Sequence, residues 1–269
     1  MHIQSSLTGL DQSSLPVLIV CDGVGGNVCG EVAARLGVSL ISQVLAGYFS
    51  ACGSATPPDD ILDLLAHALE AANSTISEQS AKEPQCHGMS ATVVCAVVVR
   101  SVLYIAWAGD SRCYVCRGST IRPVTQDHSE VQRLIDANLV PDTQMARLHH
   151  PMAHTIYQYL GRQRDFRLGT RIVPLRPGDR VLLCTDGLTD VVTDQHLATL
   201  VSQAGSTTRL ADVLVDEALR SGTHDNVTVV LYEPPASALH SDLYQRTLVH
   251  GYADELAFAL HTQLQGDSQ

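Results

Sequence analysis

The chain has 269 residues, of which 45% are hydrophobic and 17% charged, so it can bury a sizeable core as one large domain or two small ones. Its formal net charge of -11 argues against a general binder of nucleic acids or anionic membranes, because both classes usually present a basic face. Solubilising surface charge explains most of this acidic excess, and a metal site built from carboxylates would also contribute to it.

Several features bear on the compartment. The N-terminal stretch MHIQSSLTGLDQSSLP has neither the basic start nor the apolar run of a secretory signal, and the longest apolar run, residues 91–99, is too short to span a bilayer. The eight cysteines are scattered and do not indicate a disulfide framework, which favours a reducing compartment. We therefore expect a cytoplasmic protein. The single CxxC pair, Cys113 and Cys116, lies in a predicted strand, where positions i and i+3 face opposite sides, so it does not predict a zinc site.

The first half of the chain alternates between a strand, helices and more strands. A short buried strand is predicted over Val17 to Cys21, and apolar spacing predicts helices over Val28 to about Leu45 and over Asp60 to about Glu78. The segments SATVVCAVVV and VLYIAWAGDSRCYVCRG are separated only by Arg100 and Ser101, which predicts a hairpin, and STIRPVTQDHS continues the meander.

The second half of the chain again combines predicted helices and strands. A helix is predicted over Glu130 to Asn138, and residues 143–169 are expected to form a mobile segment. RVLLCTDGLTD predicts a strand that runs into Asp-Gly, helices follow over about Asp194 to Gln203 and Thr208 to Ser221, and DNVTVVLYE predicts a last strand. Tight connections between strands indicate antiparallel pairing. The fold class is therefore α+β, with helices packed on the outside of stacked sheets.

No internal repeat or linker divides the chain before about Pro234. We expect one domain over residues 1–235 and a C-terminal tail over residues 236–269. Apolar side chains in the tail outline an amphipathic helix, which would dock on its own domain or on a protein partner. These side chains are Leu243, Leu248, Tyr252, Leu256, Ala259, Leu260 and Leu264.

Aspartates lie at several predicted strand ends. Asp22 follows VLIVC and precedes Gly23, Asp186 follows RVLLCT, and Asp225 directly precedes the last strand. A carboxylate at a strand end is held by a rigid element and lies at the rim of a sheet, where oxygens from several strands can converge. Such oxygens suit hard cations such as Mg²⁺ and Mn²⁺. One Asp-Gly alone is more often a simple turn, but three strand-end aspartates with a fourth, Asp110 in GDSR, indicate a metal site.

Six ordered blocks carry a resemblance to a known family: DGVGGNVCGEVAA, GMSATVV, AGDSRCYVCRG, TQDHS, LCTDGLTDVV and HDNVTVV. In this order and spacing they resemble the metal-dependent protein phosphatases of type 2C, particularly the short bacterial members, over roughly Val17 to Glu233. The resemblance implies a sandwich of two antiparallel β-sheets flanked by pairs of α-helices, in four αββα layers. It also implies that phosphoserine and phosphothreonine in other proteins are hydrolysed by a metal-activated water.

The resemblance assigns metal ligands residue by residue. Asp22 is similar to the carboxylate that bridges two Mn²⁺ or Mg²⁺ ions, and the carbonyl of Gly23 is similar to a further ligand. Asp186 and Asp225 match the remaining ligands of the first ion, and Asp110 with Asp186 matches the pair that holds a third, weaker ion. No side chain is assigned a catalytic role, because the nucleophile is water.

Two further segments have expected roles by the same resemblance. GMSAT, Gly88 to Thr92, is expected to support the strand below the site. Residues 125–161 correspond to the family's flap beside the site and are expected to influence substrate choice. We interpret His149, His150 and His154 in this region as surface histidines.

The chain departs from the family pattern before Asp22. Family members carry an arginine that grips the substrate phosphate, and then an acidic pair whose glutamate binds the second metal, but MHIQSSLTGLDQSSLP matches neither element. Its only acid is Asp11. Either the coding start lies upstream of Met1, or the protein is a divergent member that has lost the second metal.

Three hypotheses therefore remain. The first is a Mn²⁺- or Mg²⁺-dependent protein serine/threonine phosphatase, whose partner is a phosphorylated protein and not a nucleic acid or a membrane. The second is a weak or inactive phosphatase-like binding module, which the missing arginine and glutamate favour. The third is a metallohydrolase of small phosphoesters. Converging carboxylates favour an enzyme, because their mutual repulsion costs stability unless cations bind.

Overall fold

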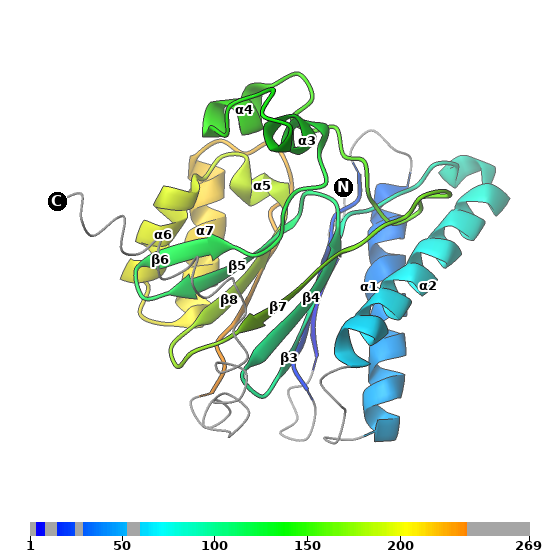
Figure 1. The fold of residues 1–269 in the computed structure, drawn as a ribbon, viewed down its shortest axis with the longest axis horizontal. Helices are drawn as coiled ribbons and strands as arrows, with labels where there is room; N and C mark the ends of the chain where they lie inside the picture. Colours follow the sequence, from blue (N-terminus) through cyan, green and yellow to red (C-terminus); the bar gives the residue numbers. More distant parts are fainter. Residues whose placement is uncertain (1–3, 9–14, 25–28, 53–59, 236–269) are drawn as a thin grey trace.

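The computed structural model describes residues 4–8, 15–24, 29–52 and 60–235, which form a sandwich of two antiparallel sheets (Figure 1). The first sheet has the strand order β1-β2-β3-β4-β7, and the second has the order β6-β5-β8-β9. The strands of the first sheet are β1 (Gln4–Thr8), β2 (Val17–Cys21), β3 (Val93–Val99), β4 (Val102–Ala108) and β7 (Gly169–Pro174). Those of the second are β5 (Arg112–Arg117), β6 (Thr120–Pro123), β8 (Arg180–Cys184) and β9 (Val229–Tyr232).

The long helices cover the two outer faces (Figure 1). Helices α1 (Gly30–Cys52) and α2 (Ile61–Lys82) pack on the first sheet, while α6 (Asp194–Gln203) and α7 (Thr207–Arg220) pack on the second. Short helices lie between α2 and α6 in the chain: η3 (Pro84–Cys86), α3 (Glu130–Asp136), α4 (Gln144–His149) and α5 (Asp186–Thr189). The four-layer αββα prediction is confirmed.

Strand alternation divides the core into three apolar layers. In β2, Ile19 faces α1 and α2, whereas Leu18 and Val20 face the second sheet. Because β2, β3 and β4 are buried on both faces, their sequences are continuous apolar runs. Cys113 lies between the sheets and Cys116 lies under α6 and α7, which confirms that this CxxC pair faces two ways.

The sequence analysis did not predict several elements, among them β1, β7 and α4. β1 pairs with β2, and β7 pairs with β4, although neither segment has a clear strand pattern. The prediction that residues 143–169 form a mobile segment did not foresee α4 there, or the β-bridge that pairs Leu160 with Ala91. Leu160 is fully buried, so its side chain holds this segment to the core. Asp11 and the tail at residues 236–269 lie outside the described residues, and the proposed domain boundary stays a prediction.

Helix α1 is long and largely apolar. Its stretch Gly30–Ala51 is long and apolar enough to cross a membrane by length and composition alone, and it is the single such helix in the described part of the chain. In the structure one face of α1, with Ala34, Val38 and Ile41, is buried in the core beside α2. Packing of this face against the core accounts for part of the apolar character of this helix.

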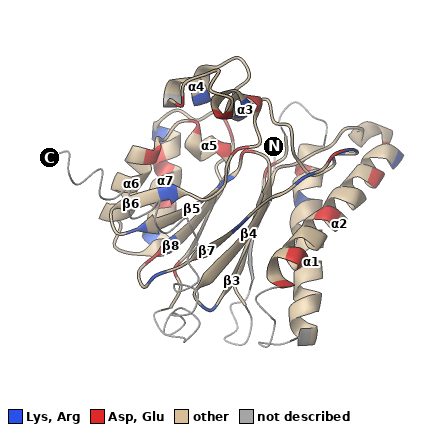
Figure 2. Ribbon diagram, in the orientation of Figure 1, with Lys and Arg blue, Asp and Glu red and all other residues tan. Residues whose placement is uncertain are grey.

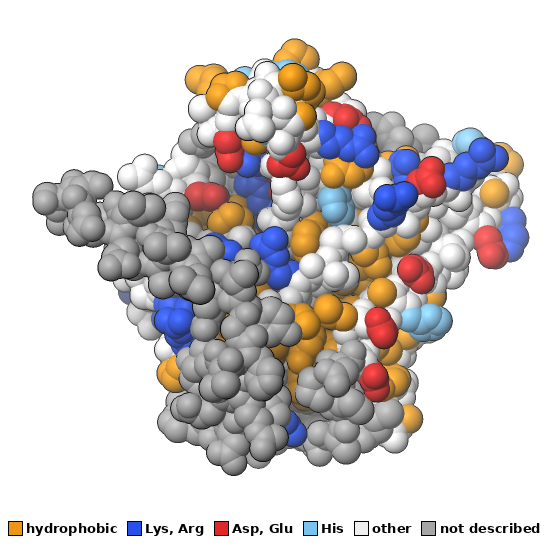
Figure 3. All heavy atoms as spheres, in the orientation of Figure 1, with side chains coloured by type: hydrophobic (Ala, Val, Ile, Leu, Met, Phe, Trp, Pro, Cys, Tyr) orange, Lys and Arg blue, Asp and Glu red, His pale blue; other side chains and the backbone are white. Residues whose placement is uncertain are grey.

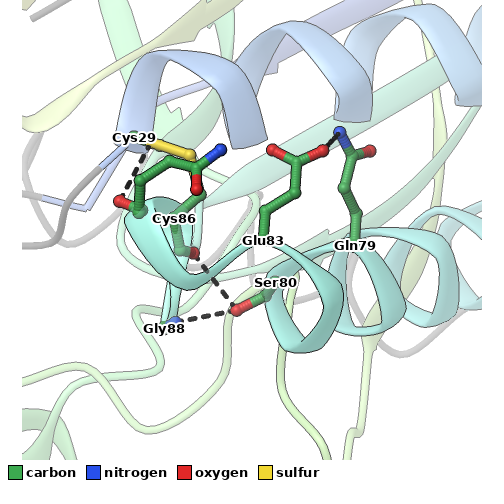
Figure 4. Close-up of a disulfide and its surroundings, with 7 residues drawn as sticks. Cys29, Gln79, Ser80, Glu83, Cys86 and Gly88 are labelled. Atoms are coloured by element: carbon green, nitrogen blue, oxygen red, sulfur yellow. Dashed lines mark hydrogen bonds between the residues drawn. A yellow bond between two sulfur atoms is a disulfide. The ribbon is translucent and has the colours of Figure 1, made fainter.

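One disulfide corrects our interpretation of the cysteines. Cys29 and Cys86 are bonded, with their Cα atoms 5.3 Å apart, and join the start of α1 to the segment after α2 (Figure 4). Cys29 Sγ also lies 3.7 Å from the Gln85 carbonyl oxygen, but a disulfide sulfur has no proton to donate. Five other described cysteines are free and buried. The interpretation that the scattered cysteines form no disulfide framework did not foresee this bond, and the cytoplasmic location stays a prediction.

Candidate metal centre

The topology brings the four predicted aspartates to one rim of the sandwich. β2 and β4 run in the same direction, so Asp22 and Asp110, which follow them, lie at the same edge of the first sheet. β5 begins two residues after Asp110, and antiparallel pairing with β8 brings Asp186 to that edge too. Asp225 precedes β9, the antiparallel partner of β8. Figure 2 shows acidic segments gathered at this upper rim, beside α5.

A network of hydrogen bonds fixes Asp22. The Thr92 amide donates to the carbonyl of Asp22 at 2.7 Å, and the Asp22 amide donates to Thr92 Oγ1 at 3.2 Å. Thr92 Oγ1 also lies 2.7 Å from Ser111 Oγ, next to Asp110. The supporting role predicted for GMSAT is therefore confirmed, because Thr92 connects the backbone of Asp22 with the end of β4.

Gly23 is required by a close backbone contact. A Cβ atom built there would lie 2.4 Å from the carbonyl carbon of Gly30, at the start of α1. Among the described residues the carbonyl of Gly23 accepts no backbone hydrogen bond, because the Gly23–Ala91 bridge uses the neighbouring amides of Val24 and Thr92. This carbonyl is therefore free of backbone partners in the described structure, and its role as a ligand, which the family resemblance implies, stays a prediction.

A second glycine brings Asp186 close to Asp225. A Cβ atom at Gly187 would lie 2.2 Å from the carbonyl oxygen of Asn226, so the two backbones touch. Thr185 ties them together, since its Oγ1 donates to the Asn226 carbonyl at 3.3 Å and accepts from the Thr228 amide at 3.1 Å. The loop before β9 is thus held against the end of β8.

The carboxylates perturb one another strongly. Burial, followed by the charges of Asp186 and Asp225, raises the pKa of Asp22 to about 9. Burial and the charge of Asp225 also raise the pKa of Asp186, while burial and Asp186 raise that of Asp110 well above its ordinary value. Such shifts mean that the ionised cluster requires protons or cations to offset its repulsion.

Two orphaned oxygens show that the donor set fits a cation. The Oδ1 atoms of Asp22 and Asp186 are each buried without a hydrogen-bond partner. The two carboxyl groups are also within hydrogen-bonding range of each other, and the backbone amide of Gly187 donates to Asp186. Carboxylate oxygens in this state are the preferred ligands of Mg²⁺ and Mn²⁺.

The four aspartates do not lie equally close to one another. Among the described residues no three His, Cys, Asp or Glu side chains surround one point at metal-ligand spacing. Asp22 and Asp186 form the tight pair, and Asp110 and Asp225 act on it through their charges. Asp225 is exposed, whereas Asp22 is only 4% exposed. The geometry therefore supports Asp22 and Asp186 most directly.

Sequence reasoning missed the groups around this cluster. Arg112, of the GDSR block, donates to both carboxylate oxygens of Asp127, of the TQDHS block, at 2.8 and 2.7 Å. Asp190, the last acid of TDGLTD, has its pKa raised to about 6 by burial and by Asp186. These residues lie inside the blocks already noted, so their charge within those blocks was the available signal.

The flap residues were partly anticipated. His149 and His154 are exposed as expected, but His154 Nδ1 lies 3.5 Å from Asp190 Oδ2, so this histidine reaches the rim of the site. The missing upstream arginine and glutamate have no counterpart among the described residues before Asp22. β1 enters the sheet from the site side, because Gln4 pairs with Cys21.

Comparisons with known proteins agree with this geometry. Residues 5–221 match the family described as Protein phosphatase 2C. The chain is 30% identical over 223 residues to the serine/threonine phosphatase stp of Listeria welshimeri, covering 83% of this chain and 86% of that protein. It is 33% identical over 216 residues to the serine/threonine protein phosphatase PstP of Mycobacterium tuberculosis, covering 80% of this chain and 40% of the relative.

Solved structures are similar as well. Serine/threonine phosphatase Stp1 from Staphylococcus aureus superposes with a TM-score of 0.78 at 28% identity, covering 87% of this chain and 89% of that one. The catalytic domain of PstP in complex with two manganese ions superposes with a TM-score of 0.68 at 30% identity, covering 86% of this chain and 95% of that one.

Proposed function

Because this chain belongs to the protein phosphatase 2C family, we propose that it is a protein phosphatase that hydrolyses phosphoserine and phosphothreonine in other proteins with Mn²⁺ or Mg²⁺. The names of the relatives, serine/threonine phosphatases of bacteria, support this substrate class. The manganese ions of the PstP catalytic domain support the choice of metal.

The observation that carries the proposal is the buried pair of orphaned oxygens on Asp22 and Asp186. A scaffold without a ligand gains nothing from two buried carboxylates that repel each other. Their placement on two different sheets, held by Thr92 and by the Gly187–Asn226 contact, is what a rigid metal site requires.

The chain's own groups divide the work. Asp22, Asp186 and Asp225 with the carbonyl of Gly23 would hold the ions, and Asp110 with Asp186 would hold a weaker third one. When bound, divalent ions supply a nucleophilic water near neutral pH and offset the charge of the phosphoryl group. Arg112 and Asp127 neutralise each other at 2.7 Å beside this cluster, so they position the start of β5.

A binding module remains the alternative, because the structure provides no arginine before Asp22 to replace the one that grips the phosphate. A phosphate dianion without this contact loses a charge-assisted, bidentate interaction. Asp11 and the tail at residues 236–269 remain candidates for a second-metal ligand and a partner surface, respectively, and both are predictions only.

The deciding experiment measures hydrolysis of a phosphothreonine peptide with millimolar Mn²⁺ by the native chain and by Asp186→Ala, with calorimetric titration of Mn²⁺ in parallel. We expect turnover by the native chain and none by Asp186→Ala. Metal binding without turnover would favour the binding module. Absence of both turnover and Mn²⁺ binding would contradict the metal site itself.

The start of the reading frame gives a second test. An in-frame Arg and Glu-Asp block upstream of Met1 would indicate a longer chain, and adding it should raise kcat/KM on the same peptide. A stop codon directly upstream of Met1 would leave the divergent member that has lost its second metal.

A further inference from the structure

A basic strap lies between the flap and β7. Residues 161–168, called here the strap, carry Arg162, Arg164 and Arg167, and Arg171 follows in β7. These are four of the 17 basic residues of a chain whose net charge is -11. Figure 2 shows blue positions along the strap, and Figure 3 shows basic side chains gathered on the same upper right part of this face, with single acidic groups among them.

These arginines are free of carboxylate partners. Within the described residues none of the four forms an ion pair, whereas Arg112, Arg117 and Arg180 elsewhere do. Arg164 and Arg167 are exposed. Positive charges that are concentrated on one segment and not neutralised by the protein itself provide a surface for an acidic ligand.

The strap backbone is held rigidly from below. Buried Asn73 of α2 accepts from the amides of Gly161 and Arg162, both at 2.9 Å, and donates to the Arg162 carbonyl at 3.0 Å. Buried Gln158 donates to the Asp165 carbonyl and accepts from the Arg167 amide, both at 3.0 Å. The side-chain amides of Asn73 and Gln158 thus form hydrogen bonds with the strap backbone. These bonds hold the loop that carries the arginines in one conformation.

Apolar anchors complete the strap. Phe166 and Leu168 pack against the core under α1 and α2, between the arginine positions. A Cβ atom at Gly161, where φ is 95°, would lie 2.6 Å from the Met89 carbonyl, so the strap begins in direct contact with the segment before β3. A fixed loop loses little conformational entropy when a ligand binds.

Both ends of the strap border the metal centre. Gly23 pairs with Ala91, and Ala91 pairs with Leu160, so Leu160 lies two strand spacings, about 10 Å, from the Gly23 backbone. At its other end Gly169 pairs with Trp107 of β4, shortly before Asp110. An extended peptide advances about 3.4 Å per residue, so about three to six residues reach from the metal centre onto the strap.

We propose that the strap binds acidic residues of the phosphoprotein substrate, about three to six positions away from the phosphorylated residue. This inference rests on the proposed phosphatase function and adds a substrate preference to it. A short acidic peptide segment fits better than DNA or an anionic membrane, because the carboxylate rim beside the strap would repel a continuous polyanion.

The test compares two phosphothreonine peptides that share the residues around the phosphate. One carries glutamates at positions three to six from the phosphothreonine, and the other carries glutamines there. We expect the native chain to show about fivefold higher kcat/KM on the acidic peptide at low salt, and this preference to disappear in the double variant Arg164→Gln/Arg167→Gln. Each peptide rate is divided by the rate of p-nitrophenyl phosphate hydrolysis by the same variant. This small substrate has no peptide to contact the strap, so the ratio corrects for any change at the metal centre.

A matched control removes the same charge elsewhere. Arg35 and Arg209 are exposed residues of α1 and α7, and the double variant Arg35→Gln/Arg209→Gln should keep the fivefold preference. Equal rates on both peptides with the native chain, or a preference that survives in the strap variant, would overturn the proposal.

A peptide-binding measurement tests the strap proposal separately from the proposed phosphatase function. If the native chain hydrolyses neither peptide nor p-nitrophenyl phosphate, the phosphatase proposal fails, and fluorescence anisotropy with the labelled peptides then measures the strap alone. Tighter binding of the acidic peptide, lost in the strap variant only, supports the proposal. Equal affinity for both peptides contradicts it, as does strap-dependent binding to phosphatidylserine vesicles or single-stranded DNA in its place.

Discussion

At the scale of single residues, the candidate metal centre depends on glycines as much as on carboxylates. Asp186 and Asp225 come from separate strands, and the missing side chain of Gly187 allows the two backbones to touch. A carboxylate pair placed by such a contact is sensitive to one added methyl group, because backbone atoms cannot move aside as a flexible side chain can.

Gly187→Ala should therefore weaken Mn²⁺ binding at least tenfold while the chain still folds, since its Cβ atom would lie 2.2 Å from the Asn226 carbonyl oxygen. The control is Gly47→Ala, the same change at an exposed position of α1, where an added Cβ atom would meet no other atom within 4 Å. It should stabilise the protein by about 0.5–1 kcal/mol. Calorimetric titration of both variants checks this, and native Mn²⁺ affinity in Gly187→Ala would contradict it.

His128 offers a pH test outside the carboxylate cluster. Burial lowers its pKa to about 4, with Asp127 opposing and Arg133 adding to this shift. The unfolded chain therefore binds more protons than the folded one between about pH 6.5 and 4, and the free energy of unfolding should fall by about 3 kcal/mol as pH falls through that window.

Chemical denaturation at several pH values measures this effect. His128→Phe, which keeps a ring between Trp107 and Tyr157, should remove this part of the pH dependence. His67→Phe on exposed α2 should keep it. An unchanged slope in His128→Phe would show that other groups cause the loss of stability.

At the scale of elements, the Cys29–Cys86 disulfide ties the start of α1 to the chain that leads into β3 (Figure 4). Gly30 touches Gly23, and the Val24 amide donates to the Ser90 carbonyl at 3.0 Å, so both tied segments border the candidate ligand at Gly23. Cys29 has φ of 62°, an unfavourable conformation for a residue with a side chain that the bond helps to hold.

Reduction should consequently destabilise the protein. Closing a loop across 57 residues stabilises the folded state by about 4 kcal/mol in the chain-entropy model. Cys29→Ser/Cys86→Ser should show this loss in chemical denaturation, and the native chain in dithiothreitol should match it. Alkylation with mass spectrometry should find these two cysteines protected before reduction, and a free Cys29 would contradict the prediction.

At the scale of the whole molecule, the candidate metal centre is shared by both sheets, so cations that bind there should stabilise the sandwich as a unit. A ligand that binds only the folded state at 100 times its Kd adds about 2.7 kcal/mol. Mn²⁺ at that ratio should raise the Tm of the native chain but leave the Tm of Asp22→Asn/Asp186→Asn unchanged in a thermal scan. Equal shifts in both would place the stabilising ions elsewhere.

The sequence by itself determined that helices pack outside stacked sheets, which strand delivers Asp22, and the chemistry of the strand-end aspartates, because these depend on local periodicity and on residue type. The four-layer αββα arrangement followed from the family resemblance. Only the tertiary structure decided that Asp22 and Asp186 form the tight pair, that Cys29 bonds Cys86, that Arg112 is neutralised by Asp127, and that Asn73 and Gln158 hold an arginine strap beside the site. β1 and β7 were missed for the same reason, since they are strands by virtue of their partners. Contacts between segments far apart in the chain leave no periodic trace, because each is set by the approach of two backbones in space.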